Sequence, residues 1–338
     1  MHTLLDRDPL DHDLFIDKEL RFYVVFGSIH PPGRIYSYLK YEPCYNSREC
    51  LSSIWRYNSV PLKRLVERYS VEYVRRVFER NQSHSHEISY GVAVPYVSWE
   101  HVIRYFKPEE RLREIYSNPR DSLELKLSEL VESIKSSLGV SLSDIGVSGS
   151  MLGGFHNPTY SDIDLVIYKC ENISRIVENI ETLVKPLDRE ELNRWISNQM
   201  FLHNIDLDLA RRMYRVYRRG VFRNTQVTFI FPQEACPYPC RYVSKPIRCI
   251  EMKTYIEPRQ CKALQYPGEI EISASISNQI KVKKIYLYEG AYSPILYEGG
   301  EILVRGSLQK VYDLRGCEEY YVISVGSREC PSEIKPLR

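Results

Sequence analysis

The sequence predicts an α+β protein of several domains that ends in a small all-β barrel. With 338 residues, the chain is too long for one ordinary hydrophobic core, so two or three domains are expected. Helical and strand-like patterns alternate between residues 121 and 231, and almost no helical pattern follows residue 240. We therefore expect an N-terminal α+β region at 1–118, a middle domain of helices and strands at 119–235, and a C-terminal β-barrel domain at 236–338.

Composition indicates a protein that works in solution. Hydrophobic residues make up 43% and charged residues 27% of the chain, and no apolar run approaches the ~20 residues of a membrane span. The N-terminal sequence MHTLLDRDPLDHD is acidic and has no apolar signal segment, so we expect a cytoplasmic protein without a membrane partner. The net charge is only +2, so a nucleic-acid surface would need local basic clusters.

The N-terminal region is expected to hold a β-hairpin and one helix. Two runs within residues 14–42, LRFYVVFGSI and RIYSYLKYEP, are rich in aromatic and β-branched residues, and the turn-forming sequence HPPG separates them. Their mixed aromatic and basic side chains are typical of a half-solvated sheet face and also of a nucleic-acid surface. Apolar residues recur near helical spacing between residues 60 and 80, which predicts a helix there.

The middle region shows the sharpest signals for secondary structure. Asp121 with Glu124 predicts a capping box, an apolar stripe follows at helical spacing, and Gly139 ends the helix. The remaining expected elements are, in order, a strand in SDIGVSGS, a strand in DIDLVIYK, a helix in NISRIVENIETLV, a helix in DREELNRWI with its own capping box, a helix at 207–219 that Asp206 caps, and a strand at 225–231.

The C-terminal region contains five strand-like runs and almost no helical pattern. They are RCIEMKTYI, EIEISASIS, KVKKIYLYEG, EILVRGSLQKVY and YYVISVGS. Short strands joined by glycine-rich turns favour a small closed barrel, with an OB-type barrel as the first interpretation and a small sandwich as the alternative.

The nine cysteines are scattered along the chain. The tightest cluster is CPYPC, at Cys236 and Cys240, with Cys249 and Cys261 beyond it. A four-thiolate zinc site usually shows two short C-x-x-C pairs, which this chain lacks. We therefore expect buried free thiols, with a zinc site or a disulfide of a hyperthermophile protein as the alternatives.

One stretch, GVSGSMLGGFHNPTYSDIDLVIY at residues 146–168, carries the chemistry of the chain. Asp162 and Asp164 stand two positions apart on a strand, so both point to one face with Cα atoms roughly 6.6 Å apart. Two hard oxygen ligands of this kind could hold a divalent cation. Upstream, a strand ends in Gly149 and Ser150 at a helix start, where backbone N–H groups and a hydroxyl suit a phosphate.

This stretch resembles the nucleotidyltransferase domain of the DNA polymerase beta superfamily, in which a Gly-Ser pair is followed by Asp-x-Asp. The resemblance covers about residues 144–232 and implies a small mixed sheet backed by helices. It makes Gly149 and Ser150 the triphosphate contacts and Asp162 and Asp164 the ligands of Mg²⁺ or Mn²⁺. More loosely, the whole chain resembles archaeal predicted nucleotidyltransferases, in the hairpin sequence HPPGR, in GSMLGGFHNPTYSDIDL and in RRMYRVYRRG.

The chain departs from the superfamily pattern at two points. A third carboxylate usually stands on a later strand, but TQVTFIF offers Thr228 and no acid. Asp206 and Asp208 are expected to cap a helix rather than to bind metal, and Glu234 is a weaker substitute. The Gly-Ser helix also lacks a basic residue before His156, which is expected either to contact phosphate or to have a structural partner.

Five arginines fall in or near the predicted helix 207–219: Arg211, Arg212, Arg215, Arg218 and Arg219. With no acid among them they repel one another unless an anion or an acidic partner lies opposite. We expect Arg211 and Arg215 to bind the nucleotide, or the cluster to bind a nucleic-acid backbone; a solvated helix face is the alternative.

The sequence therefore predicts a metal-dependent nucleotidyltransferase that moves a nucleoside monophosphate from a nucleoside triphosphate to a hydroxyl group. RNA or DNA is the expected acceptor, and small-molecule or protein acceptors stay open. The rival hypothesis is a nucleic-acid-binding protein on a degenerate transferase scaffold, since no third carboxylate is identified. A purely structural partner is disfavoured by the intact Asp-x-Asp sequence.

Overall fold

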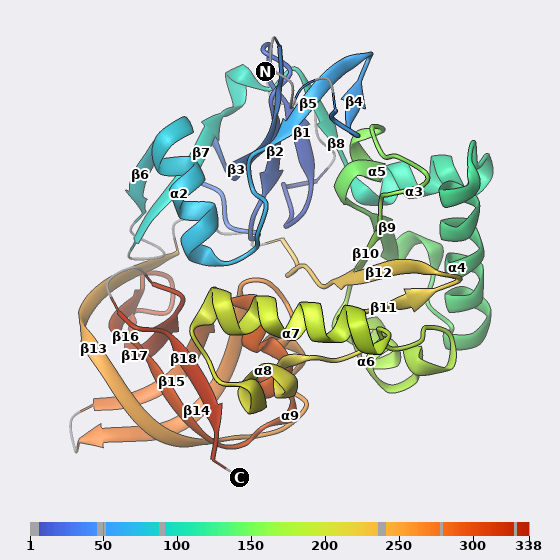
Figure 1. Ribbon diagram of the computed structural model, residues 1–338. Coiled ribbons are helices and arrows are strands. Elements are labelled where there is room, and N and C mark those ends of the chain that lie inside the picture. The colour runs from blue at the N-terminus through green and yellow to red at the C-terminus, as the bar shows by residue number, and fades with distance from the viewer. Residues whose placement is uncertain are drawn as a thin grey trace.

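Three groups of elements pack around a common centre in the computed structural model (Figure 1). The structure describes residues 7–45, 50, 52–87, 92–235, 241–277, 280–327 and 330–337. The N-terminal sheet, the middle sheet with its helices, and the C-terminal sheet follow one another along the chain. No helix in the described part of the chain is long and apolar enough to cross a membrane.

The described part of the N-terminal region contains both strands and helices, as expected. Its strands are β1 (Leu14–Ile16), β2 (Phe22–Val25), β3 (Arg34–Pro43), β4 (Arg56–Tyr57), β5 (Val60–Arg64), β6 (His84–Glu87), β7 (Val92–Ser98) and β8 (Arg104–Phe106). The main path of the sheet is β4-β5-β3-β2-β1-β8, and β7 joins β3 to β6. The antiparallel pairing of β2 with β3 confirms the predicted hairpin.

The helix predicted between residues 60 and 80 is wrong in its first half. Residues 60–64 form β5, which pairs with β3 and β4, and helix α2 (Val71–Asn81) begins only after Ser70. The Ser70 side chain accepts a hydrogen bond from the Tyr73 N–H, which caps the helix. Strand pairing of β5 therefore overrides the helical spacing of its apolar residues.

The middle region contains a four-stranded sheet in the order β11-β12-β10-β9. Its strands are β9 (Ile145–Val147), β10 (Ile163–Ile167), β11 (Arg219–Phe222) and β12 (Thr225–Ile230). Strands β10 and β12 are parallel, while β9 and β11 pair antiparallel with their neighbours. The helices are α3 (Pro108–Ser117), α4 (Ser122–Leu138), α5 (Gly149–Gly153), α6 (Cys170–Asn179), α7 (Arg189–His203) and α8 (Leu207–Met213).

The helix boundaries of this region confirm most of the capping predictions. Asp121 caps α4, and Gly139 ends it in the left-handed conformation. Glu124 does not complete a capping box, because its carboxylate binds the Arg120 N–H and the Arg111 side chain instead. The complete capping box predicted at Asp188 is present on α7.

The helix predicted at 207–219 ends early. Asp206 caps α8 as expected, but the helix stops at Met213, and Arg219 already belongs to β11. Strand β11 pairs with β12, with Arg219 opposite Thr228. Arg218 therefore lies in a turn and Arg219 on a strand, so their side chains do not share a helix face with Arg211.

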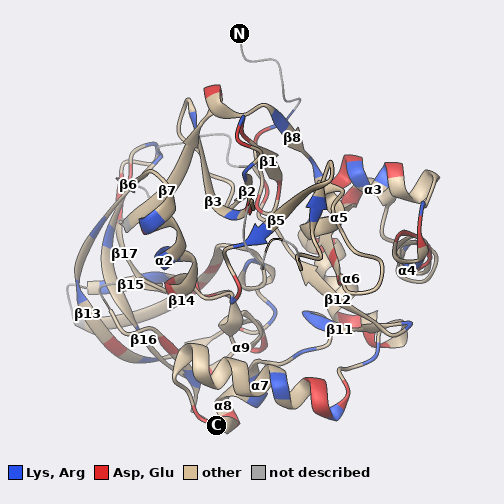
Figure 2. Cartoon of the chain, turned by 45° about the horizontal axis from the view of Figure 1, so that its top comes forward, with Lys and Arg blue, Asp and Glu red and all other residues tan. Residues whose placement is uncertain are grey.

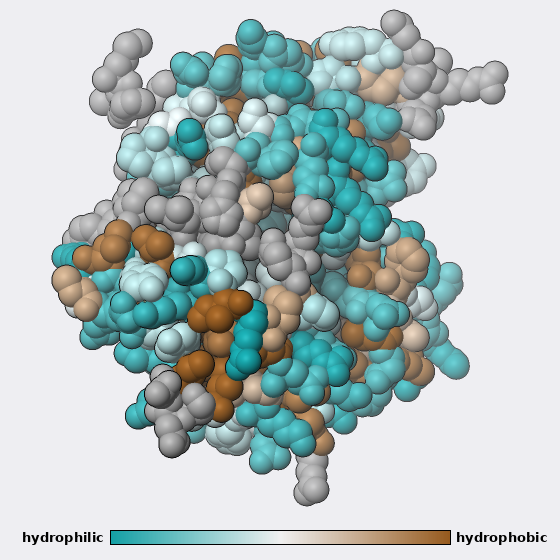
Figure 3. Space-filling view, turned by 90° about the vertical axis from the view of Figure 1, so that its left-hand side faces the viewer, coloured by the Kyte–Doolittle hydropathy of each residue, from teal (hydrophilic) through white to brown (hydrophobic). Residues whose placement is uncertain are grey.

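The C-terminal region is almost entirely β, with one short helix. It contains β13 (Tyr242–Ile256), β14 (Gly268–Ser277), β15 (Ile280–Leu287), β16 (Gly300–Asp313), β17 (Glu318–Val325), β18 (Glu333–Pro336) and α9 (Ser293–Glu298). The sheet order is β13-β16-β17-β15-β14, and β18 pairs with β16. No pairing joins β13 to β14 among the described residues, so the sheet forms a half-barrel there. Figure 3 shows apolar residues gathered on the lower part of one face, where this sheet lies. On β13, the large apolar side chain of Ile247 is exposed.

One hydrophobic cluster crosses both expected domain boundaries. Leu112 and Ile115 of α3 lie before residue 118, yet they pack with α4 and β9 of the middle region. The same cluster continues through Ile256 and Leu264 into the C-terminal sheet. The middle and C-terminal regions thus share one core in this structure.

The expectation of free thiols is wrong for six cysteines. They form the disulfides Cys44–Cys50, Cys170–Cys261 and Cys249–Cys330, while Cys317 is free and exposed. The second of these joins the start of α6 to the segment before β14. Two of these pairs join cysteines that are 91 and 81 residues apart, which meet only in the fold and leave no local signal in the sequence. The CPYPC cluster lies outside the described residues.

Candidate functional site

A cavity of about 980 Å³ lies where the three regions meet. Its walls include Lys40 and Arg64 from the N-terminal sheet, Ser150 and Asp164 from the middle region, and Glu289 from the C-terminal region. This volume is at the upper end of the range found for small-molecule sites, and it exceeds what a single small metabolite fills. The cavity is therefore large enough to enclose a drug-sized ligand.

The two aspartates of the predicted metal site both line this cavity. Asp162 directly precedes β10 and Asp164 lies within it, while the intervening Ile163 is fully buried on the other face. The predicted common face for the carboxylates is therefore present. Burial raises the pKa of Asp164, the like charge of Asp162 raises it further, and Lys40, His12 and Arg219 lower it. A divalent cation would relieve this repulsion.

Gly149 leaves room for the Asp164 carboxylate. The glycine begins α5 with φ +64°, and an added Cβ atom would lie 2.2 Å from Asp164 Oδ2. The backbones are also tied together, because the Ser148 N–H donates to the Asp164 carbonyl at 2.8 Å. Both the left-handed conformation and the close approach thus require glycine at this position.

Ser150, the second predicted phosphate contact, is buried at the cavity wall. Its hydroxyl donates to Ser161 Oγ at 3.3 Å, just before the aspartates. The preceding Ser148 hydroxyl donates to the His12 carbonyl at 2.8 Å, which attaches this turn to the N-terminal region. The structure therefore brings Gly149, Ser150, Asp162 and Asp164 together as the sequence predicted.

The position beside Asp164 on the neighbouring strand holds a threonine. Thr228 of β12 is paired with Asp164, and its hydroxyl is buried without a hydrogen-bond partner in the described structure. Asp206 caps α8, and neither it, Asp208 nor Glu234 is among the residues that line the cavity. The other carboxylates of the cavity wall belong to Asp11, Glu67 and Glu289.

The described residues contain one cluster of three potential metal ligands, Asp121, Glu124 and His156. Each of these groups already has a partner: His156 Nε2 contacts Asp121 at 2.8 Å, and Glu124 binds Arg111 at 2.7 Å. Asp121 also caps α4. For His156 the structure thus supplies a structural partner, the second of the two predicted roles.

Several cavity residues come from the N-terminal region, and of these the sequence indicated only Lys40, as one of the basic residues of the hairpin. Asp11 is almost fully buried and holds the His12 imidazole through Nδ1 at 2.6 Å. Lys40 is 7% exposed, and its ammonium lies 5.2 Å from the centre of the Tyr69 ring. Arg64 lies beside the same ring, at 5.4 Å. No local motif marks these residues, because only tertiary packing brings them to Asp164.

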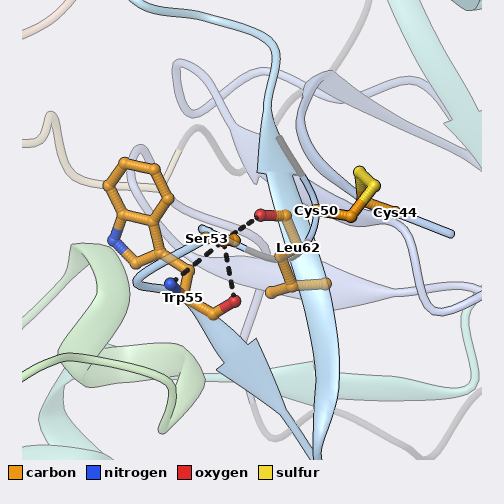
Figure 4. Close-up of a disulfide and its surroundings, with 5 residues drawn as sticks. All are labelled: Cys44, Cys50, Ser53, Trp55 and Leu62. Atoms are coloured by element: carbon orange, nitrogen blue, oxygen red, sulfur yellow. Dashed lines mark hydrogen bonds between the residues drawn. A yellow bond between two sulfur atoms is a disulfide. The ribbon is translucent and has the colours of Figure 1, made fainter. Parts of the chain in front are cut away.

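Trp55, another cavity residue, is held by a short network below the Cys44–Cys50 disulfide (Figure 4). The Ser53 hydroxyl donates to the Leu62 carbonyl at 2.6 Å, and its oxygen accepts from the Trp55 N–H at 3.2 Å. Arg64 packs over the indole at 5.7 Å. This part of the wall therefore combines an aromatic surface with a positive charge.

The arginines divide into two groups. Arg215, Arg218 and Arg219 line the cavity, whereas Arg211 is exposed on α8 and does not belong to the described cavity wall. The predicted role of Arg211 as a nucleotide contact therefore has no support in this geometry. Arg215 is ion-paired with Glu298 of α9. Arg219 Nη2 lies 3.8 Å from Asp162, and the basic residues of β11 and β5 are visible in Figure 2.

Glu289 is, like Asp164, a cavity carboxylate whose pKa is raised. Burial raises its pKa to about 7, while a hydrogen bond from the Val71 N–H at 3.1 Å lowers it. His203 Nδ1 lies 3.9 Å away, and burial lowers the pKa of that histidine to about 4. Glu289 is thus poised between its neutral and charged forms near neutral pH.

Comparisons with known proteins leave the activity open. No protein-family profile and no solved structure matches the chain. The chain is similar to an uncharacterized protein of the archaeon Methanocaldococcus jannaschii, with 28% identity over 200 residues. The match covers 56% of this chain and 57% of that protein's length. The name of this relative assigns no activity, so function rests on the site.

Proposed function

We propose that the protein is a metal-dependent nucleotidyltransferase, which transfers a nucleoside monophosphate from a nucleoside triphosphate to a hydroxyl acceptor. The observation that carries this proposal is the juxtaposition of the Gly149–Ser150 turn with Asp164. The Gly149–Ser150 turn lies directly against Asp164, and Ser150, Asp162 and Asp164 line a cavity whose volume suits a nucleotide. The four-stranded sheet with β10 parallel to β12 supports a polymerase-beta-type domain.

The residues of this site suit Mg²⁺ or Mn²⁺. Mg²⁺ is commonly held by one or two carboxylates, with substrate phosphates and water completing its coordination. Asp162 and Asp164 provide that donor set, and their mutual repulsion favours a cation between them. When bound, the metal would neutralise phosphate charge and lower the pKa of the attacking hydroxyl.

The protein groups have separate tasks in this proposal. The turn at Gly149 and Ser150 binds phosphate oxygens through N–H groups and the serine hydroxyl. Arg219 lies beside Asp162 and binds negative charge as the bond to the leaving pyrophosphate breaks. The aromatic side chains of the wall, Trp55 and Tyr69, enclose the acceptor and exclude water. We propose a nucleic-acid end as the acceptor because unpaired bases can stack on these aromatic rings.

A second candidate function rests on Thr228. The residue paired with Asp164 on the adjacent strand is not an acid, so the third carboxylate of the superfamily pattern is missing there. A chain that had lost catalysis would keep the cavity and its positive charges as a nucleic-acid-binding site. Retention of both aspartates against the glycine turn favours the enzyme.

Calorimetry of nucleotide binding tests the metal site. The unmodified protein should bind a nucleoside triphosphate more tightly with Mg²⁺ than without it. The double variant Asp162→Asn, Asp164→Asn should lose this metal dependence, while circular dichroism stays unchanged because Ile163 and Leu165 still anchor β10. Equal binding with and without metal in the unmodified protein would show that the carboxylate pair does not hold a cation.

A further inference from the structure

A bound triphosphate needs positive charge, and the Gly149–Ser150 turn does not supply it. Residues 149–155 contain no basic side chain, and Arg215 is already paired with Glu298. The charge of a bound Mg²⁺ would be balanced largely by Asp162 and Asp164 themselves. A nucleotide in the cavity therefore requires further cations from other parts of the wall.

The N-terminal sheet provides two cations that form no ion pair with a carboxylate among the described residues. Lys40 of β3 is 7% exposed and forms no ion pair with any described residue. Its ammonium lies 5.6 Å from the Tyr41 ring centre and 5.2 Å from that of Tyr69. Burial alone lowers the pKa of the Lys40 ammonium, but the surrounding tyrosines and Asp164 raise it above its ordinary value, so Lys40 stays a cation inside the cavity.

Arg64 of β5 is the second cation. Its Nε donates to the Val66 carbonyl at 2.8 Å and its Nη2 donates to the Tyr69 hydroxyl at 3.0 Å. Its Nη1 has no partner among the residues that the structure describes, and no described carboxylate pairs with it. These two bonds fix the guanidinium at the cavity wall and leave one edge available to an anion.

We propose that Lys40 and Arg64 bind the triphosphate of the nucleotide from the N-terminal sheet, facing the aspartates of β10. Both residues line the same cavity as Ser150, Asp162 and Asp164. Lys40 is close enough to Asp164 to act on its charge. The N-terminal region thereby forms part of the nucleotide site, and together with Arg219 it supplies the charge missing from the Gly-Ser turn. This assignment rests on the proposed nucleotidyl transfer.

Calorimetry with inorganic triphosphate and Mg²⁺ tests this assignment on the full-length protein. Lys40→Met and Arg64→Met should each weaken triphosphate binding by about tenfold or more, because each removes a charge-assisted contact. Lys63→Met is the matched control: Lys63 is exposed, stands next to Arg64 on β5 and lies outside the described cavity wall, so affinity should stay unchanged. Lys40→Arg, which keeps the charge, should retain most of the binding. Thermal unfolding verifies that each variant is folded.

A second titration with single-stranded RNA and DNA oligonucleotides identifies the source of the phosphate. Oligonucleotide affinity should change less than triphosphate affinity in both methionine variants. Loss of oligonucleotide binding alone would assign the two cations to a nucleic-acid backbone and overturn the proposal, as would unchanged triphosphate affinity in both folded variants. If triphosphate binding depends on Lys40 and Arg64 but no nucleotide is transferred, this site stands and the proposed activity fails. If nucleotide transfer occurs but triphosphate affinity is unchanged in both variants, the proposed activity stands and the assignment of Lys40 and Arg64 fails.

Discussion

Gly149 packs so closely against the Asp164 carboxylate that no side chain fits at position 149, since a Cβ atom there would lie 2.2 Å from Asp164 Oδ2. The contact joins the two halves of the sequence motif, which stand fifteen positions apart, into one site. It also explains the left-handed conformation of the glycine, which lets α5 start directly against the carboxylate. The same packing constraint thus places both the proposed phosphate contact and the proposed metal ligand.

Gly149→Ala should displace Asp164 and abolish metal-dependent nucleotide binding. The left-handed backbone alone costs an alanine roughly 1–2 kcal/mol, and the clash adds to it. Gly154→Ala is the control, because Gly154 has φ +71° and a Cβ there would meet nothing within 4 Å. Urea unfolding and calorimetry compare the two variants. Equal stability and equal nucleotide affinity would show that the contact with Asp164 has no consequence.

Arg219 and Arg211 should behave differently when each is replaced by glutamine. Arg219 lies in the cavity beside Asp162, so its loss should weaken nucleotide binding about tenfold. Arg211 is exposed on α8, and its replacement should leave nucleotide affinity unchanged. The salt dependence of polynucleotide binding separates the enzyme from the nucleic-acid-binding protein. If Arg219→Gln lowers polynucleotide affinity and flattens its salt dependence but leaves nucleotide binding unchanged, the result favours the nucleic-acid-binding protein.

Glu289 should make stability depend on pH near neutrality. Its pKa in the folded protein, about 7, lies above the ordinary value of 4.5. The stabilisation is therefore fully present below pH 4.5 and is lost as the pH rises through 7. Between pH 5 and 8 the contribution of Glu289 to the free energy of unfolding should therefore fall by about 2 kcal/mol. The buried His203 and His30 act in the opposite direction, because burial lowers the pKa of each from 6.5 to about 4 and their cost to stability disappears as the pH rises through 6.5. The contribution of Glu289 is therefore measured against a variant in which only Glu289 is changed.

Glu289→Gln supplies the comparison for that pH dependence. The amide cannot ionise, so relative to the variant the wild-type protein should lose about 2 kcal/mol of stability between pH 5 and 8, as measured by chemical unfolding at a series of pH values. A wild-type profile that already matches the variant would show that Glu289 ionises normally despite its burial.

The Cys170–Cys261 disulfide should stabilise the contact between the middle and C-terminal regions. It closes a loop of 91 residues across the shared hydrophobic core. Replacing both cysteines with serine should lower the free energy of unfolding by about 2–4 kcal/mol. Cys317→Ser is the control, because that thiol is free and exposed. Unfolding of the double variant at the same urea concentration as the control would show that the link contributes nothing.

Local sequence signals predicted the motif and its surroundings well. The Gly-Ser turn, the β10 aspartates and the caps at Asp121, Asp188 and Asp206 depend on residues close together in the chain, and all are present. The first half of the helix predicted between residues 60 and 80 was wrong, because residues 60–64 form β5 and pair with β3, about twenty positions earlier in the chain. Long-range pairing has no signature in local periodicity.

The rest of the site could not be predicted for the same reason. Lys40 and Arg64 reach Asp164 only because the N-terminal sheet packs over the middle region. The disulfide partners of Cys170 and Cys249 are likewise distant in sequence. The pairing of Arg219 with Thr228 likewise joins two strands and places Arg219 at the cavity, whereas Arg211 lies on α8 outside the described cavity wall.

The central claim is transfer of a nucleotide, and one assay tests it directly. The purified protein is incubated with Mg²⁺ or Mn²⁺, labelled nucleoside triphosphates and a pool of RNA and DNA with free hydroxyl ends. The proposal predicts metal-dependent covalent labelling of an acceptor, reduced at least about a hundredfold in the Asp162→Asn, Asp164→Asn variant. Tight binding of the nucleic acids without labelling under either metal would contradict the claim and favour a degenerate, nucleic-acid-binding scaffold.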